Sequence, residues 1–230
     1  MARYVITGAT GGIGGATARQ LHAQGHQVVL LGSDRARLDA ATAALPGSEG
    51  LLLDLRDPAA LAGGAAPLTA GGGAVDGLVH SAGLALLGSI ADTAPETWTT
   101  QFTVNVVAAA ELTRALLPAL RAARGHVVFV NSGQGLRTNP GWGAYSAAKH
   151  AARALAEALR EEERPHGLRV TSVYPGRTAT GMQQSIRAQE GGAYLSEQYS
   201  SPESVAGAVV GALLSPGDME ITDITVRPGG

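Results

Sequence analysis

The chain has 230 residues and a formal net charge of −2, with 45% hydrophobic and 16% charged residues. These values predict a compact globular chain rather than a disordered one, and the near-neutral charge favours neither a nucleic acid nor an anionic membrane as a partner. The chain lacks cysteine, which excludes disulfide bonds and a thiol nucleophile. No carboxylate cluster accompanies its six histidines, so we expect no metal site.

Short apolar segments alternate with alanine-rich segments from one end of the chain to the other. We expect strands at 3–7, 27–31, 50–53, 76–80, 126–131, 168–174 and 222–226, and helices at 12–24, 35–44, 96–123, 143–164 and 202–213. Continuous apolar strands suit a parallel sheet that is covered on both faces. The alternation therefore predicts one doubly wound α/β domain over residues 1–230, with a seven-stranded parallel sheet.

Three further features complete the predicted organisation. The glycine-rich stretches 63–65 and 71–73 indicate a turn and a loop between a short helix and the fourth strand. The segment 180–200 has no clear pattern. The first strand begins at residue 3, which leaves no room for a signal peptide, and no uninterrupted apolar run reaches membrane-spanning length, so we expect a cytoplasmic protein.

A glycine-rich turn at residues 7–14 follows the first strand and opens the first helix. Glycine in such a turn allows the backbone to approach a phosphate closely, and the helix N-terminus adds free N–H groups and a favourable dipole. Many strand–helix turns carry glycine for geometry alone, but the position after the first strand favours a nucleotide. The candidate contacts are Gly8, Thr10, Gly11, Gly12, Ile13 and Gly14.

The end of the second strand bears on which dinucleotide would bind. A site for NAD usually has an acidic residue there, whereas this chain has Gly32, which leaves room for a phosphate. Ser33, Arg35 and Arg37 are candidates to contact that phosphate, which favours NADP over NAD. The alternative is that both arginines are solvated helix charges, and Asp34 favours this alternative.

The spacing of one tyrosine and one lysine predicts chemistry. Lys149 is the only lysine among 17 basic side chains, and it follows Tyr145 by four residues. These positions share a face of a helix, so the ammonium can lie beside the phenol. An ordinary lysine here would be a surface residue of an amphipathic helix. The chain uses arginine everywhere else, and because the compact ammonium differs from the planar guanidinium, the retained lysine favours a function.

These motifs together resemble the short-chain dehydrogenase/reductase family, over essentially the whole chain. The glycine-rich turn matches the family's Thr-Gly-x-x-x-Gly-x-Gly motif, and Tyr145 and Lys149 match its Tyr-x-x-x-Lys motif. Further matches are Asp54 and Leu55 at the adenine, the segment His80-Ser81-Ala82-Gly83 in place of Asn-Asn-Ala-Gly, then Asn105, Ser132, Pro175, Gly176, Thr178 and Thr180. Ser81 and Gly11 depart from the family's pattern, Gly11 at a position where many NADP-binding relatives carry a basic residue. The resemblance implies a Rossmann-like fold.

The resemblance also implies hydride transfer between a nicotinamide cofactor and a carbonyl or alcohol carbon. Tyr145 would be the general acid/base, Lys149 would lower the pKa of Tyr145 and hold the ribose, and Ser132 would bind the substrate oxygen. Asn105 would interrupt its helix and anchor a water that carries protons from Lys149. Residues 175–180 would hold the nicotinamide carboxamide. The alternatives are a cap role for Ser132 and an exposed or back-bonded side chain for Asn105.

Residues 84–90, 134–142 and a lid at 178–200 are expected to form the substrate wall. Its candidates are mostly apolar, which favours an apolar or aromatic carbonyl compound; they are Leu84, Leu86, Leu87, Gln134, Leu136, Trp142, Met182, Tyr194, Leu195 and Tyr199. The alternative is that half of these side chains simply pack the lid. The helices at 96–123 and 143–164 form the subunit interface in the family, and their alanines permit close packing, so we expect a homodimer or homotetramer.

Three classes of function remain open. An NADP(H)-dependent oxidoreductase is favoured. The second class is a cofactor-sensing regulator on the same fold, but such proteins typically lose the tyrosine or the lysine, and this chain has both. The third class is non-redox chemistry in the same cleft, such as epimerisation or dehydration. The sequence does not identify the substrate.

Overall fold

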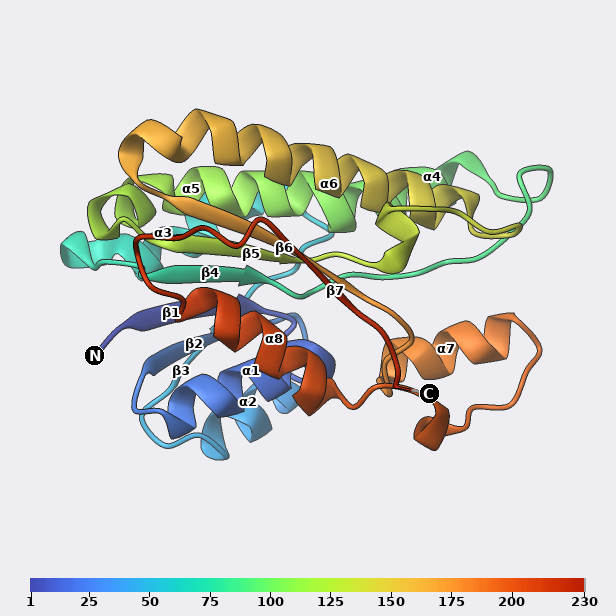
Figure 1. Ribbon diagram of the computed structural model, residues 1–230, viewed down its shortest axis with the longest axis horizontal. Helices are drawn as coiled ribbons and strands as arrows, with labels where there is room; N and C mark the ends of the chain where they lie inside the picture. Colours follow the sequence, from blue (N-terminus) through green and yellow to red (C-terminus); the bar gives the residue numbers. More distant parts are fainter. Residues whose placement is uncertain (230) are drawn as a thin grey trace.

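Seven parallel strands form one sheet in the computed structural model, which describes residues 1–229 (Figure 1). The strands lie in the order β3-β2-β1-β4-β5-β6-β7. They are β1 (Arg3–Thr7), β2 (Gln27–Gly32), β3 (Glu49–Leu52), β4 (Gly77–His80), β5 (His126–Val130), β6 (Arg169–Pro175) and β7 (Asp223–Val226). Each predicted strand is present, with its ends within one residue of the prediction, and the Rossmann-like α/β class is confirmed.

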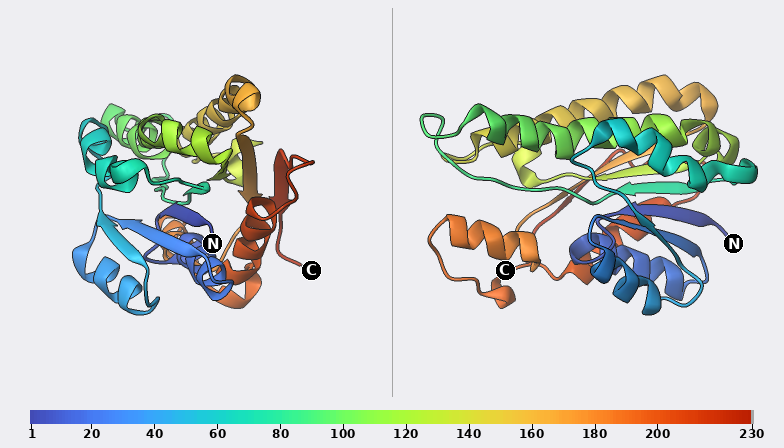
Figure 2. Two further views of the ribbon diagram at one scale, coloured as in Figure 1. Left: turned by 90° about the vertical axis from the view of Figure 1, so that its left-hand side faces the viewer. Right: turned by 180° about the vertical axis from the view of Figure 1, so that it is seen from behind.

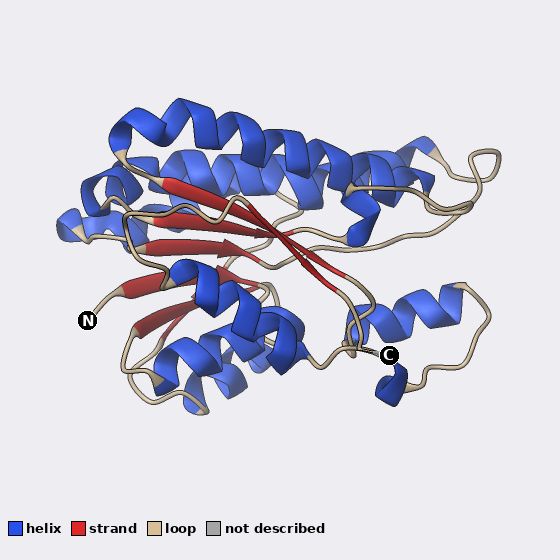
Figure 3. Cartoon of the chain, viewed as in Figure 1, coloured by secondary structure: helices blue, strands red, loops and turns tan. Residues whose placement is uncertain are grey.

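Helices cover both faces of this sheet (Figures 1 and 2). One face carries α1 (Gly12–Ala23), α2 (Arg35–Ala43) and α8 (Pro202–Leu213). The other carries α3 (Pro58–Thr69), α4 (Pro95–Phe102), α5 (Ala108–Ala123) and α6 (Gly143–Glu163). Beyond the carboxyl ends of the strands lie α7 (Gly181–Gln189) and the short helix η5 (Ser196–Gln198), which occupy much of the segment without a clear sequence pattern (Figure 3).

Each face of the sheet has its own hydrophobic core. Neighbouring residues of a strand point to opposite faces, so Val127 packs into the core on the α5 face and Val128 into the core on the α1 face. Val5 and Ile6 of β1 divide in the same way. Because both faces are covered, the central strands need apolar residues at every position, which explains their continuous apolar runs.

The expected helix at 96–123 is a continuous helix of 29 residues that changes its hydrogen bonding in the middle. A π-helical turn, η2 (Thr103–Val107), separates α4 from α5. By length and apolar composition alone this helix could cross a membrane, with a mean hydropathy of 1.2 over an 18-residue window of which half is buried inside the protein. The helix is not an uninterrupted apolar run, because Glu111 and Arg114 lie within it. The buried half packs in the core with α3 and α6.

The glycine-rich stretch 63–65 is not a turn, because α3 runs through it. Gly64 has a packing reason to lie inside a helix, since a Cβ there would collide with the Leu53 side chain. The absence of that Cβ lets α3 lie close to the segment that follows β3. The low helix propensity of glycine favours a turn at this stretch, but the chain forms a helix there. The later stretch, 71–73, includes part of the short helix η1 (Ala70–Gly72) and leads to β4 as expected.

Candidate active site

A cavity of about 500 Å³ lies at the carboxyl ends of the strands, where the strand order reverses between β1 and β4. Ligands of doubly wound sheets bind at this reversal. Most of the predicted site residues line it, namely Gly8, Thr10, Gly11, Gly12, Ile13, Ser81, Ala82, Gly83, Ser132, Gln134, Trp142, Tyr145, Lys149, Pro175, Gly176, Thr178, Thr180 and Met182. The structure therefore gathers side chains from distant parts of the sequence around one space.

The glycine-rich turn forms one wall of this cavity through its backbone. Gly8 has φ +66°, and a Cβ there would lie 2.9 Å from Ala82. Gly14 does not line the cavity; a Cβ at Gly14 would lie only 2.6 Å from the Gly8 carbonyl oxygen, so glycine lets α1 start directly against β1. Gly11 caps α1 without a side-chain hydrogen bond. The first N–H groups of α1 thus remain available to an anion.

Thr7 joins this turn to the end of β4. Its hydroxyl oxygen accepts hydrogen bonds from the backbone N–H groups of Ser81 and Ala82, both at 3.0 Å, and donates to the Val79 carbonyl at 3.3 Å. The family's asparagine is replaced by Ser81 at this place. The Thr7 hydroxyl therefore holds the β1 and β4 ends together without an asparagine side chain at position 81.

Tyr145 and Lys149 lie one turn apart on α6 and face the cavity. Both side chains are buried, with 4% and 6% exposed, and the Lys149 Nζ lies 5.9 Å from the centre of the Tyr145 ring. The ammonium also donates a hydrogen bond to the Val130 carbonyl at 3.3 Å. Asn131 donates to the Lys149 carbonyl at 3.1 Å and so fixes α6 against the end of β5. The spacing in the sequence places the phenol and the ammonium together, as expected.

Ser132 follows β5 and lines the same cavity. Its hydroxyl accepts a hydrogen bond from the Gln134 N–H at 3.1 Å and caps the short helix η3 (Gly133–Gly135). The cap is thus real, but it does not exclude a role in chemistry, because the hydroxyl keeps its proton for a second partner.

Asn105 lies in the π-helical turn, where the helix is locally interrupted as expected. Its side chain is buried and bonds the backbone of Leu84 twice, accepting from the N–H at 3.2 Å and donating to the carbonyl at 3.0 Å. A Cβ at Gly83 would lie 2.7 Å from the Asn105 Oδ1 and 3.7 Å from the Lys149 Nζ. Asn105 is therefore neither exposed nor back-bonded, and it supports the segment between β4 and the Lys149 ammonium.

Burial sets the pKa values of the two central groups. Burial raises the pKa of Tyr145 above its ordinary value, and the Ser132 hydroxyl lowers it in part. Burial lowers the pKa of Lys149 to about 8. In the protein alone, burial is the largest effect on the pKa of Tyr145, and the group that opposes it is the Ser132 hydroxyl rather than the expected Lys149 ammonium. The phenol is thus protonated at neutral pH.

A second cavity of about 210 Å³ continues past the glycine-rich turn to the ends of β2 and β3. Ser33, Asp54, Leu55 and Leu84 line it, together with Arg56. Asp54 accepts hydrogen bonds from the Arg56 guanidinium at 2.7–3.1 Å, which holds the pKa of the Asp54 carboxyl below its ordinary value. Charged groups therefore line the mouth of this cavity.

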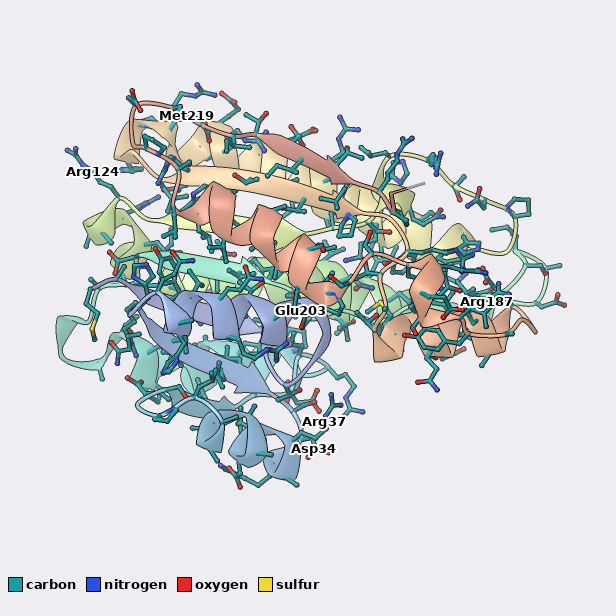
Figure 4. The ribbon with its side chains drawn as sticks, turned by 60° about the horizontal axis from the view of Figure 1, so that its bottom comes forward. Asp34, Arg37, Arg124, Arg187, Glu203 and Met219 are labelled. Atoms are coloured by element: carbon teal, nitrogen blue, oxygen red, sulfur yellow. The ribbon has the colours of Figure 1, made fainter. Side chains whose placement is uncertain are left out.

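The two candidate arginines after β2 differ in position. Arg35 lines neither cavity, because its exposed guanidinium lies 3.7 Å from Asp39 on the same helix. Arg37 lines the larger cavity and donates to the Thr10 carbonyl at 3.4 Å. Asp34 caps α2 by accepting from the Arg37 N–H, and Figure 4 shows the two residues together near the glycine-rich turn. Of the two predicted arginines, Arg37 lines a cavity and Arg35 does not, and their contact with a phosphate stays a prediction.

A family model described as short chain dehydrogenase matches residues 3–191. The chain belongs to the short-chain dehydrogenase family. Among curated proteins, dehydrogenase/reductase SDR family member 7B of Bos taurus is 36% identical over 225 residues, which cover 91% of this chain and 69% of that protein. The chain spans only 62% of the length of the Rattus norvegicus protein of the same name, which is 35% identical.

Solved structures of this oxidoreductase family share the whole fold. An alcohol dehydrogenase from the archaeon Thermococcus sibiricus, complexed with 5-hydroxy-NADP, has a TM-score of 0.88 and 27% identity, covering 99% of this chain and 97% of the other. A serine dehydrogenase complexed with NADP⁺ has a TM-score of 0.87 and 28% identity, covering 98% and 94%. The short-chain dehydrogenase fold therefore extends over the full described chain.

The substrate side of this short-chain dehydrogenase is more polar than the sequence indicates. Of the predicted wall, only Gln134, Trp142 and Met182 line the larger cavity. Leu84 lies at the second cavity instead, and Leu86, Leu87, Leu136, Tyr194, Leu195 and Tyr199 line neither. The sequence interpretation missed Asn131 and Arg177. It did not single out Arg137, Asn139, Gln183 and Ile186, although these four lie in the expected wall segments 134–142 and 178–200. Several of these lie within three residues of predicted site positions, so proximity in sequence was the available signal.

The lid begins at the end of β6 and adjoins the glycine-rich turn. Thr180 caps α7 by accepting from the Gln183 N–H at 3.2 Å, and Thr178 donates to the Gly176 carbonyl at 3.1 Å. A Cβ at Gly12 would lie 3.3 Å from the Thr180 methyl group. The two segments that the resemblance assigns to the pyrophosphate and the nicotinamide therefore lie in contact range.

Proposed function

We propose that this short-chain dehydrogenase is an NADP(H)-dependent oxidoreductase that interconverts a carbonyl compound and an alcohol by hydride transfer. One observation carries the proposal. Tyr145 and Lys149 are buried together beside Ser132, in a cavity whose opposite wall is a glycine-rich turn at a helix N-terminus. A phenol, an ammonium and a hydroxyl at one end and an anion cradle at the other suit a dinucleotide and a small polar substrate.

The residues present fit a dinucleotide. Side chains at Gly8 and Gly12 would fill the space beside Ala82 and Thr180, and the first N–H groups of α1 face the cavity. We assign the pyrophosphate to Gly8, Gly11, Gly12 and Ile13, the adenosine to the second cavity with Asp54 and Leu55, and the nicotinamide to Pro175, Gly176, Thr178 and Thr180. The joined cavities thus run along the ends of β2, β1, β4, β5 and β6.

A bound nicotinamide supplies or accepts the hydride. In the direction of reduction, Tyr145 gives its proton to the substrate oxygen, and its raised pKa keeps that proton available at neutral pH. Ser132 donates a hydrogen bond to the same oxygen and holds that oxygen beside the phenol. Lys149 keeps one donor on the Val130 carbonyl and uses the others to position the ribose hydroxyls. Asn105 fixes the wall opposite Lys149 through Leu84.

The residues at and after the end of β2 favour NADP over NAD. Gly32 replaces the acid that an NAD site usually has, and a Cβ at Gly32 would lie 2.7 Å from the Thr10 methyl group, so a larger side chain has little room there. Arg37 lines the larger cavity, Ser33 lines the second cavity and Thr10 lines both, so Arg37 and Ser33 are the candidates to bind a 2′-phosphate. The NADP complexes of the two similar solved structures support the same choice.

Two further expectations belong to this proposal. We place the protein in the cytoplasm, and we expect a homodimer or homotetramer that packs through the outer faces of the α4–α5 helix and α6. A cofactor-sensing regulator and a non-redox epimerase or dehydratase are the competing functions. Both predict cofactor binding without net transfer of hydride to a ketone or aldehyde.

The proposal is tested by following the hydride itself. The protein is incubated with NADPH that carries deuterium at nicotinamide C4, on each face in turn, and with a panel of ketones, aldehydes and quinones. We expect one face to transfer deuterium to the carbonyl carbon of at least one ketone or aldehyde. Tight NADPH binding with no label in any product would contradict an oxidoreductase and favour the regulator.

A further inference from the structure

The larger cavity is strongly cationic. Its lining includes three arginines and one lysine, namely Arg37, Arg137, Lys149 and Arg177. Over the residues that the structure describes, neither aspartate nor glutamate lines it. A space with several cations and no carboxylate of its own attracts anions. The phosphates of a dinucleotide explain the charge near the glycine-rich turn, but they do not reach every cation in the lining.

Three of these four cations already have partners. Lys149 donates to the Val130 carbonyl, and Arg37 donates to the Thr10 carbonyl in the glycine-rich turn. Arg177 makes two hydrogen bonds to Glu190 on the lid, at 2.7 and 3.0 Å. Arg187 of α7, labelled in Figure 4, also pairs with Glu190. Two arginines therefore share one carboxylate, and the Arg177 charge is largely neutralised.

Arg137 is the exception. Its guanidinium has neither an ion-pair nor a hydrogen-bond partner among the described residues, although its backbone N–H is bonded to the Gly133 carbonyl at 3.3 Å. It lies five residues after Ser132 and eight before Tyr145, on the loop that joins the two. The side chain is exposed on the rim of the cavity rather than buried in it. An unpaired guanidinium on this loop can meet a substrate bound between Ser132 and Tyr145.

The loop that carries Arg137 is held in place. The Thr138 hydroxyl donates to the Ser146 hydroxyl at 2.9 Å, and the Ser146 hydroxyl donates to the side-chain oxygen Oε1 of Gln134 at 3.0 Å. Because that oxygen is occupied, the Gln134 side chain offers its NH₂ group to a ligand. Asn139 adds a second amide side chain to the lining. The cavity lining therefore offers amide N–H donors from Gln134 and Asn139 as well as the Arg137 guanidinium, and this set of donors suits an oxyanion.

The rest of the substrate side is apolar. Trp142, Met182 and Ile186 line the cavity, and the Trp142 ring lies edge-on to the Tyr145 ring with their centres 5.8 Å apart. These side chains can pack against the body of a small molecule whose carbonyl lies at Tyr145. The sequence-based expectation of an apolar substrate therefore applies to this part of the ligand alone.

We propose that the substrate of this site carries a carboxylate, which Arg137 binds at the rim of the cavity while Trp142, Met182 and Ile186 contact its apolar body. The inference rests on the proposed function, since it names the class of carbonyl compound or alcohol that reacts. A guanidinium matches a carboxylate with two parallel hydrogen bonds, and one positive charge balances one carboxylate. Arg137 thereby determines specificity and takes no part in the proton or hydride transfer.

The test compares two aldehydes that differ only in charge, 4-carboxybenzaldehyde and its methyl ester. For the wild-type protein with NADPH we expect a KM about tenfold lower for the acid, because an exposed charged hydrogen bond contributes on the order of one factor of ten. Arg137→Gln removes this preference and leaves kcat and the KM of the ester unchanged. Arg137→Lys restores part of it. The matched control is Arg164→Gln, which removes an exposed arginine paired with Glu161, outside the cavity lining.

A binding measurement separates this inference from the proposed function. Titration calorimetry of benzoate into the NADP⁺-loaded protein, and into the protein alone, should show weaker binding to Arg137→Gln than to wild type and Arg164→Gln. If neither aldehyde is reduced but benzoate binding depends on Arg137, the carboxylate site stands, and the oxidoreductase proposal is decided separately by the deuterium-transfer experiment. If both aldehydes are reduced equally well, or if Arg137→Gln binds benzoate like wild type, the carboxylate inference is wrong.

Discussion

The two ends of the cleft differ in burial, and the difference explains what each end can do. At the end that holds Tyr145, Lys149 and Asn105, these residues are 4–6% exposed, and backbone partners fix the side chains of Lys149 and Asn105. At the adenosine end, the side chains of Arg56 and Asp54 are 71% and 43% exposed and bond each other. A buried polar group must find a fixed partner, whereas an exposed one exchanges partners with solvent. The buried end is therefore rigid, and the exposed end sets preference by small increments.

The largest effect should come from the buried ammonium. Lys149→Arg keeps the charge but replaces the compact ammonium, which bonds the Val130 carbonyl beside Tyr145, with a wide planar guanidinium. We expect kcat to fall at least ~10³-fold, the scale of a lost general acid/base system. NADPH oxidation is the measurement. Turnover at the wild-type rate would show that the compact ammonium is not required.

The second prediction concerns stability, which should fall when a side chain is added at Gly14, where α1 packs closely on the glycine-rich turn. The Cβ of Gly14→Ala would approach the Gly8 carbonyl, and we expect about 3 kcal/mol lower free energy of unfolding in urea. Gly63→Ala is the matched control, because a Cβ at Gly63 in α3 would have no atom within 4 Å. That control should gain roughly 0.5–1 kcal/mol from helix propensity. Equal effects of the two substitutions would contradict the close packing of α1 on β1.

The buried histidine at the end of β4 gives the stability a pH dependence. Burial lowers the pKa of His80 to about 3, and its ring lies 2.8 Å from the Thr113 hydroxyl. Between pH 3 and 6.5 the unfolded chain binds the extra proton, so stability falls as pH falls through this window. Between pH 6.5 and pH 5, the free energy of unfolding of His80→Asn should fall by roughly 2 kcal/mol less than that of the wild type. Unfolding curves at both values test this, with exposed His166→Asn as the control that keeps the wild-type slope.

The smallest effect belongs to the exposed end. Arg37→Ala should weaken NADPH binding about tenfold and leave NADH binding unchanged, because one charged contact to the 2′-phosphate is lost. Arg35→Ala should leave both unchanged, since Arg35 faces Asp39. Titration of cofactor fluorescence measures all four values. A larger effect at Arg35 than at Arg37 would overturn the assignment of the phosphate contact.

Sequence reasoning succeeds where the backbone dictates the outcome. The i, i+4 spacing of Tyr145 and Lys149 reappears in the structure. The local interruption at Asn105, which the family resemblance implied, is also present. The strand ends were also predictable, because continuous apolar runs have few other solutions in a covered parallel sheet. These features depend on chain geometry and burial, which residue spacing records directly.

The failures share a different cause. Gly64 lies inside a helix, and the side chain that a Cβ there would meet is Leu53, which lies outside that helix. Arg35 pairs with Asp39, so Arg37 faces the glycine-rich turn instead. The pKa of Tyr145 is raised by burial, a property of the assembled fold rather than of the lysine beside it. Each miss concerns a tertiary contact or a choice among exposed partners, which local pattern does not encode.

The most direct test of the account is the activity of Tyr145→Phe together with its cofactor affinity. This substitution removes one buried hydroxyl and keeps the ring that packs on Trp142. We predict an NADPH dissociation constant within about twofold of wild type and a kcat reduced at least ~10³-fold for any carbonyl that the wild type reduces. A variant that binds NADPH normally and still reduces that carbonyl at the wild-type rate would show that the phenol is not the proton donor.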